Sequence, residues 1–142
     1  MYRSAFFVHF SLPREARSLS GSEKESLEIW RNPILPKFIS IEEAVKMIPD
    51  GATVMFGGFM GCGNAHKFID ALSKSGVKDL TMICNDGGMP GGPMGEDFYG
   101  TAKLIHNKQV KRMIATHVGL NPEVGIQSFD GTLETILVPQ GS

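Results

Sequence analysis

The sequence predicts an α/β fold with a doubly wound, mainly parallel sheet. Short apolar runs typical of buried strands alternate with segments in which apolar residues recur at helical spacing. This alternation is typical of βαβ units, whose strands run parallel. With 142 residues, 42% of them hydrophobic, the chain is long enough for one such domain and short for two.

The chain is organised around the stretch from Asp50 to Ala65. An apolar run over 52–56 predicts a strand, and the glycine loop 57–63 leads from it into a predicted helix over 65–75. Glycine costs conformational entropy, so four glycines in this loop indicate a backbone that bends sharply or comes close to a ligand. We expect the loop amides to face a substrate.

The other elements follow from capping residues, apolar spacing and chain breakers. A capping box over 40–43 begins the first helix, and Pro49 ends it. The segment 85–95 is so rich in glycine and proline that we expect a long mobile loop, placed to line a site at the end of a strand. The remaining elements are a strand over 80–84, a helix over 99–107, a strand over 110–116, a helix over 122–129 and a strand over 135–138.

The two ends of the chain differ from its middle. Residues 1–36 are partly aromatic and partly polar, and we expect a disordered N-terminal extension or the product of a start codon placed too early. A mitochondrial transit peptide is less favoured, because acidic residues interrupt its arginines. The predicted domain is 37–142, and its last strand lacks the covering helix that a parallel sheet needs. We therefore expect a domain that is incomplete at its C-terminal end.

Composition argues against several kinds of partner. Fourteen basic and fifteen acidic residues give a formal net charge of −1, which offers no electrostatic footprint for nucleic acid or an anionic membrane. No apolar run approaches the roughly 20 residues that span a bilayer. With two cysteines in the chain, the reducing cytoplasm is the expected location, and the mitochondrial matrix is the alternative.

Cofactor motifs are incomplete in this sequence. A dinucleotide fingerprint would need a glycine where His66 stands, although Asp86 lies at the distance of a ribose-binding acid. No Gly-Lys-Ser or Gly-Lys-Thr is present for phosphoryl transfer. The cysteines and histidines lack the paired spacings of metal sites. We expect no metal and no permanently bound cofactor.

Cys62 is the one candidate nucleophile in the glycine loop. It lies directly before a predicted helix N-terminus, a position that can activate a thiol. The alternative is a small residue that fills a tight turn, and we favour it because His66 is the only histidine near enough in sequence to act as a base. A Cys62-dependent thioester hydrolase is therefore the weaker hypothesis.

The motif Asp50-Gly51-x-x-Val54-Met55-Phe56-Gly57-Gly58-Phe59-x-x-x-Gly63 resembles the signature of the alpha subunit of family I 3-oxoacid CoA-transferases. The signature's closing proline is Ala65 here, a mild departure. The resemblance covers 37–142, and further matching segments follow in the family's order. They are Ser75-Gly76-Val77-Lys78-Asp79-Leu80-Thr81, Asn85-Asp86, Asn107-Lys108-Gln109-Val110-Lys111-Arg112, His117-Val118-Gly119-Leu120-Asn121-Pro122-Glu123 and Val138-Pro139-Gln140-Gly141.

The resemblance implies an activity and a division of labour. Such enzymes, including acetate, butyrate and acetoacetate CoA-transferases, move coenzyme A between carboxylic acids, and their alpha and beta subunits pair into heteromers. Their nucleophile is a glutamate of the beta subunit, so the alpha chain is expected to shape the pocket. By resemblance, Gln140 is an amide donor to the thioester oxygen and Asn85 lies at the edge of the site. The substrate-binding loop is assigned in the same way to Gly57, Gly58, Phe59, Gly61 and Gly63.

We therefore predict part of a CoA-transferase alpha subunit, with coenzyme A as a substrate. It would act on an acyl-CoA and a short-chain carboxylic or 3-oxo acid, in a heterodimer or heterotetramer with a beta subunit. Family members continue past this point with further strands, so a truncated chain is implied, inactive alone. The alternative is a truncated, non-catalytic binding protein.

Overall fold

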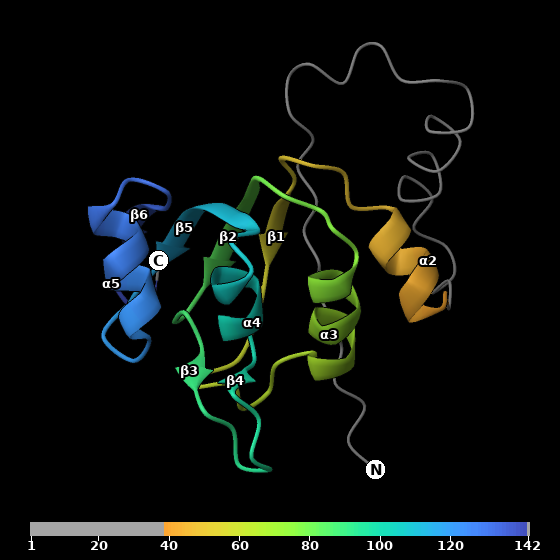
Figure 1. Ribbon diagram of the computed structural model, residues 1–142, viewed down its shortest axis with the longest axis horizontal. Coiled ribbons are helices and arrows are strands. Elements are labelled where there is room, and N and C mark those ends of the chain that lie inside the picture. Colours follow the sequence, from red (N-terminus) through yellow and green to blue (C-terminus); the bar gives the residue numbers. More distant parts are fainter. Residues whose placement is uncertain (1–38, 142) are drawn as a thin grey trace.

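Four parallel strands form the central sheet of the computed structural model, in the order β1-β2-β5-β6 (Figure 1). The structure describes residues 39–141. The strands are β1 (Thr53–Met55), β2 (Leu80–Cys84), β5 (Val110–Ala115) and β6 (Glu134–Leu137). The mainly parallel α/β fold predicted from the sequence is confirmed.

The helices form a layer over one face of this sheet (Figure 1). They are α2 (Ile41–Lys46), α3 (His66–Lys74), α4 (Ala102–His106) and α5 (Pro122–Phe129). Each strand of the sheet pairs with the one before it, so right-handed crossovers bring α3, α4 and α5 to the same face. A doubly wound sheet is defined by a reversal of its strand order. Within residues 39–141 the strand order does not reverse.

The core lies between the sheet and the helix layer. Strand side chains alternate between the two faces, and most inward ones of β1, β2 and β5 are buried almost completely, whereas Leu137 of β6 is 61% exposed. A fully buried aliphatic side chain of this size stabilises the fold by about 1.5–3 kcal/mol. The largest members of the core are Val54, Leu80, Met82 and Met113 on the strands, and Ile69, Leu72, Leu104, Ile105 and Val124 on the helices.

The opposite face of the sheet carries one apolar row and one polar row. The strand registers align Met55, Ile83, Ile114 and Ile136 in the apolar row. The polar row is formed by Thr53, Thr81, Arg112 and Glu134, and within it Arg112 Nε lies 2.6 Å from Oε2 of Glu134. Met55 is 43% exposed and Ile136 38%, so this face is only partly covered.

The expectation of a loop without regular structure over 85–95 is wrong in part. Strand β3 (Met89–Pro90) pairs antiparallel with β4 (Phe98–Tyr99). The Gly91 N–H donates to the Asp97 carbonyl at 2.8 Å, which continues the hairpin. Tyr99, expected in a helix, therefore lies in a strand. The glycines serve this hairpin: Gly91 and Gly95 have positive φ angles of 77° and 85°, which let the chain reverse.

The remaining elements match the prediction within one residue at each end, except that α4 begins at Ala102, three residues later than predicted, and α2 ends before Pro49. The predicted capping box is present: Ser40 Oγ accepts the Glu43 N–H at 3.1 Å, and the Ser40 N–H donates to Glu43 Oε2 at 2.8 Å. The predicted N-terminal extension, 1–36, lies outside the described residues.

Gln109 ties α3 to the start of β5 and should be important for stability. It is 5% exposed, and its Nε2 donates to the carbonyls of Leu72 at 3.1 Å and Val77 at 2.8 Å. In Gln109→Leu the Val77 carbonyl loses its donor, so we expect the free energy of unfolding to fall by about 1–3 kcal/mol in a urea titration. Lys111→Gln, an exposed change on the same strand, should shift it by less than about 0.5 kcal/mol. Equal stability of both variants would contradict the assignment.

Candidate functional site

The predicted site residues lie where the strands end. The glycine loop 57–63 follows β1, Asn85 follows β2, and Gln140 lies just beyond β6. Because the strands are parallel, their carboxyl ends share one edge of the sheet. Open α/β sheets bind ligands at this edge.

Thr116, directly after β5, joins two of these residues. Its Oγ1 lies 2.5 Å from Asn85 Oδ1, 3.0 Å from the Asn85 carbonyl oxygen and 2.8 Å from Gln140 Oε1. A hydroxyl has one proton to donate, so these acceptors compete for it. Thr116 is not among the residues predicted from the sequence. The one signal that could have found it is its position at the end of a strand predicted to lie in the same sheet as that of Asn85.

Gln140 is exposed, and its side-chain oxygen is the atom that faces Thr116. Its Nε2 has no hydrogen-bond partner within residues 39–141. A primary amide carries two N–H donors on that nitrogen. Gln140 can therefore offer both donors to a ligand at this edge while its oxygen stays engaged.

The tip of the glycine loop is a tight turn closed by its own backbone. The Phe59 N–H donates to the Cys62 carbonyl at 3.0 Å, and the Cys62 N–H donates to the Phe59 carbonyl at 2.9 Å. Between them Met60 and Gly61 have φ angles of 52° and 80°, the signs of a type I′ turn. A left-handed conformation costs a non-glycine residue such as Met60 about 1–2 kcal/mol.

Asp86 fixes this turn to the end of β2. It is 4% exposed, and its Oδ2 accepts the Met60 N–H at 2.9 Å while its Oδ1 accepts the Gly88 N–H at 2.9 Å. Hydrogen bonds from amides to a carboxylate are stronger than neutral ones, and this pair offsets the strain at Met60. Both oxygens are engaged by loop amides, which leaves Asp86 unsuited to the ribose-binding role considered from the sequence.

Close packing within and around the loop explains why two of its positions are glycine. A Cβ at Gly58 would lie 2.6 Å from the Cys62 carbonyl, and one at Gly61 would collide with the Tyr99 ring. Gly57, by contrast, has open space around it. The N–H groups of Gly57, Gly58 and Gly63 have no partner within the described chain, so these exposed amides are the ones left for a ligand.

Side chains from α3 and its N-terminal approach brace the loop from the other side. Asn64 Nδ2 donates to the Gly57 carbonyl at 2.6 Å, and His66 Nε2 lies 2.8 Å from the Gly61 carbonyl. The His66 ring also stacks on Tyr99 of the hairpin, with ring centroids 4.5 Å apart. The loop is therefore held rigidly before any ligand arrives.

The structure does not bring the glycine loop into contact with Gln140. Strands β1 and β6 are the outer strands of the sheet, and three strand spacings separate them by roughly 14 Å. The end of β2 connects the two: Asp86 reaches the loop, and Asn85 reaches Gln140 through Thr116. The candidate site is an elongated edge, which suits an extended ligand.

Neither thiol forms a catalytic pair. Burial, with the Asp86 charge as the second cause, raises the pKa of the Cys84 thiol to about 12, so it stays protonated at neutral pH. Cys62 is exposed, and its expected base, His66, is turned toward the Gly61 carbonyl. This arrangement gives no support to a Cys62-dependent hydrolase.

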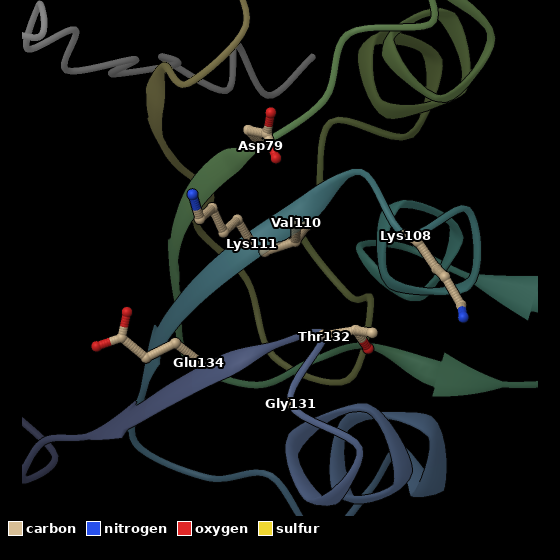
Figure 2. A pocket seen from close by; sticks show the side chains of 7 residues that line it. All are labelled: Asp79, Lys108, Val110, Lys111, Gly131, Thr132 and Glu134. Carbon is tan, nitrogen blue, oxygen red and sulfur yellow. The ribbon is translucent and has the colours of Figure 1, made fainter.

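A hollow at the opposite edge of the sheet does not coincide with these residues. It lies at the amino-terminal ends of β2, β5 and β6, and Figure 2 shows the Lys108 side chain pointing away from Lys111 and Glu134. Acidic and basic side chains both line this hollow, and they do not form a group that could bind a ligand. The lining residues are Asp79, Lys108, Val110, Lys111, Gly131, Thr132 and Glu134.

Within residues 39–141, no three side chains of His, Cys, Asp or Glu are grouped in a way that could hold a metal ion. None of the helices in this part of the chain has the length and apolar character needed to cross a membrane.

The family model described as "Coenzyme A transferase" matches residues 38–142. The chain belongs to the coenzyme A transferase family. It is 46% identical over 106 residues to "Probable coenzyme A transferase subunit alpha" of Bacillus subtilis, covering 75% of this chain and 43% of the relative. It is 40% identical to "Acetate CoA-transferase subunit alpha" of Escherichia coli and 42% identical to "Acetoacetyl-CoA:acetate/butyrate CoA transferase alpha subunit" of Clostridium acetobutylicum, each match covering 75% of this chain and 45% of the relative.

These matches confirm the resemblance stated from the motifs. The chain spans less than half the length of these curated CoA-transferase relatives.

Asp86→Asn tests the carboxylate that holds the glycine loop. An amide offers one oxygen where the carboxylate offers two, so either Met60 or Gly88 loses its acceptor. We expect the free energy of unfolding to drop by about 1–3 kcal/mol in urea, because a buried N–H is left unpaired. The exposed Asp97→Asn serves as the matched control and should leave stability unchanged. A similar stability for Asp86→Asn and wild type would argue against the role.

Thiol titration tests the two cysteines, the only ones in the chain. At pH 8 we expect one thiol, that of Cys62, to react with Ellman's reagent in the folded protein. Cys84 should react only in denaturant, because its raised pKa and its burial keep the reactive thiolate scarce. In Cys62→Ser the fast phase should vanish, and a fast phase that persists there would show that Cys84 is accessible.

Proposed function

We propose that this chain forms part of the alpha subunit of a CoA-transferase that moves coenzyme A between an acyl-CoA and a short-chain carboxylic or 3-oxo acid. The observation that carries the proposal is the Gln140 amide, presented beside Asn85 and Thr116 at the carboxyl edge of the sheet. The names of the relatives, which specify acetate and acetoacetyl-CoA:acetate/butyrate transfer, support this class of substrate. Coenzyme A is then a substrate and not a resident cofactor.

The nucleophile comes from a beta subunit in this proposal. Several glutamates of residues 39–141 have partners other than Asn85, Thr116 and Gln140. Glu96 Oε2 accepts the Met94 N–H. Glu123 pairs with His106, and Glu134 pairs with Arg112. The enzyme is thus a heterodimer or heterotetramer, and its expected location is the cytoplasm. The names of the relatives as alpha subunits support such a partner.

Gln140 then acts on the charge that develops during acyl transfer. When a carboxylate attacks the thioester carbonyl carbon, the carbonyl oxygen gains negative charge. The Nε2 donors of Gln140 are neutral and held in place, so they can stabilise that charge without reorganising. One such donor typically contributes about 2.7–4 kcal/mol to the transition state.

The glycine loop serves a different part of the same substrate. Its free amides, at Gly57, Gly58 and Gly63, lie across the edge from Gln140. They are suited to the acyl or carboxylate side, where backbone N–H groups can bind oxygen without adding charge. Phe59, 51% exposed on this loop, offers the apolar wall that a short acyl chain needs.

Gln140→Ala in the complex of the full-length chain with its beta subunit tests the proposed activity. We expect kcat for CoA transfer to fall about 10²- to 10³-fold, the usual cost of removing one oxyanion donor. Lys108→Gln, in the hollow at the opposite edge, is the control and should retain full activity. A Gln140→Ala rate within twofold of wild type would count against the role. Absence of activity in the wild-type complex would favour a non-catalytic binding protein.

A further inference from the structure

The geometry assigns to Thr116 the role of a positioning residue that sets the orientation of the Gln140 amide, an inference that rests on the proposed function. A primary amide can present either its oxygen or its nitrogen to a ligand. Only the nitrogen carries donors. The orientation of Gln140 therefore decides whether it can act on a thioester oxygen at all.

Thr116 is fixed in place by the backbone around it. The N–H groups of Thr116 and His117 both donate to the Asn85 carbonyl at 3.1 Å, which ties the end of β5 to the end of β2. Threonine is branched at Cβ, so few side-chain rotamers are open to it. Its hydroxyl thus has a defined direction before any substrate binds.

Gln140 lacks any comparable restraint of its own. It is exposed and follows β6, whose last backbone bond runs from the Val138 N–H to the Ala115 carbonyl at 3.0 Å. The hydroxyl of Thr116, 2.8 Å from Oε1, makes the one hydrogen bond to the Gln140 side chain within the described residues. That contact selects the rotamer in which Oε1 is engaged and Nε2 is free.

Asn85 gives the hydroxyl a second acceptor. Its Oδ1 lies 2.5 Å from Thr116 Oγ1, so the side-chain amides of Asn85 and Gln140 compete for the same hydroxyl proton. The orientation of Gln140 is consequently coupled to Asn85. A substrate group that donates to Asn85 Oδ1 would weaken that oxygen as a competing acceptor and shift the Thr116 proton toward Gln140.

The first test is structural and independent of activity. In the isolated ¹⁵N-labelled chain, we expect the side-chain NH₂ resonances of Gln140 to show restricted motion in wild type and in Thr116→Ser, and free rotation in Thr116→Val. Thr81→Val is the matched control: Thr81 is half-buried on β2, and its hydroxyl makes no hydrogen bond within residues 39–141. An unchanged Gln140 amide in Thr116→Val would overturn the inference.

The second test uses kinetics of the complex with the beta subunit. Thr116→Val should lower kcat roughly 10- to 100-fold, as expected for a displaced reacting group, with little change in KM. Thr116→Ser should restore most of kcat. The double variant Thr116→Val with Gln140→Ala should be no slower than Gln140→Ala alone, because both changes remove one interaction.

The outcomes separate the two proposals. Additive losses in the double variant would show that Thr116 acts other than through Gln140, and would overturn the inference. If Gln140→Ala is fully active, the proposed oxyanion role fails, while the amide resonances still report whether Thr116 orients Gln140. Circular dichroism of Thr116→Val, compared with Thr81→Val, checks that the variant is folded.

Discussion

The buried carboxylate of Asp86 is the constraint on which the carboxyl edge depends. It accepts one N–H from the turn after β1 and one from the segment after β2, and so binds two loops into one platform. Asn85, its neighbour in sequence, faces the other way, toward Thr116 and Gln140. Two successive residues just after β2 thus connect both halves of the site.

The chemistry at this edge is that of neutral donors. The groups left for a ligand are backbone amides and the Gln140 amide, whereas the nearby thiol of Cys84 is kept protonated by burial. Neutral donors stabilise an oxyanion as it forms without first binding the substrate carboxylates too tightly. In the proposed function, such a chain would polarise the electrophile while a partner supplies the nucleophile, which agrees with the division of labour that the resemblance implies.

Local signals in the sequence were enough for most of the fold. The capping box at Ser40 and the apolar spacing of the helices depend on residues three or four positions apart, and they locate elements well. The hairpin formed by β3 and β4 was not predicted, because glycine and proline indicate a turn without indicating which segments pair across it.

The site was harder to predict because its contacts are long-range. The hydroxyl of Thr116 meets Asn85 from 31 positions away and Gln140 from 24, and no periodicity connects them. Asn85 and Gln140 were found through the family motifs alone, and Thr116 through the structure alone. The incomplete glycine pattern argued against a ribose ligand at Asp86, but only the geometry shows that this carboxylate serves the loop itself.

The unreversed strand order has a consequence for synthesis. Each strand pairs with the strand of the sheet that precedes it, so each βαβ unit can close on the one already formed as the chain leaves the ribosome. Every unit that closes in this way adds one side chain to the row Met55, Ile83, Ile114 and Ile136 on the face opposite the helices. The nascent domain thus carries an apolar row that lengthens as translation proceeds.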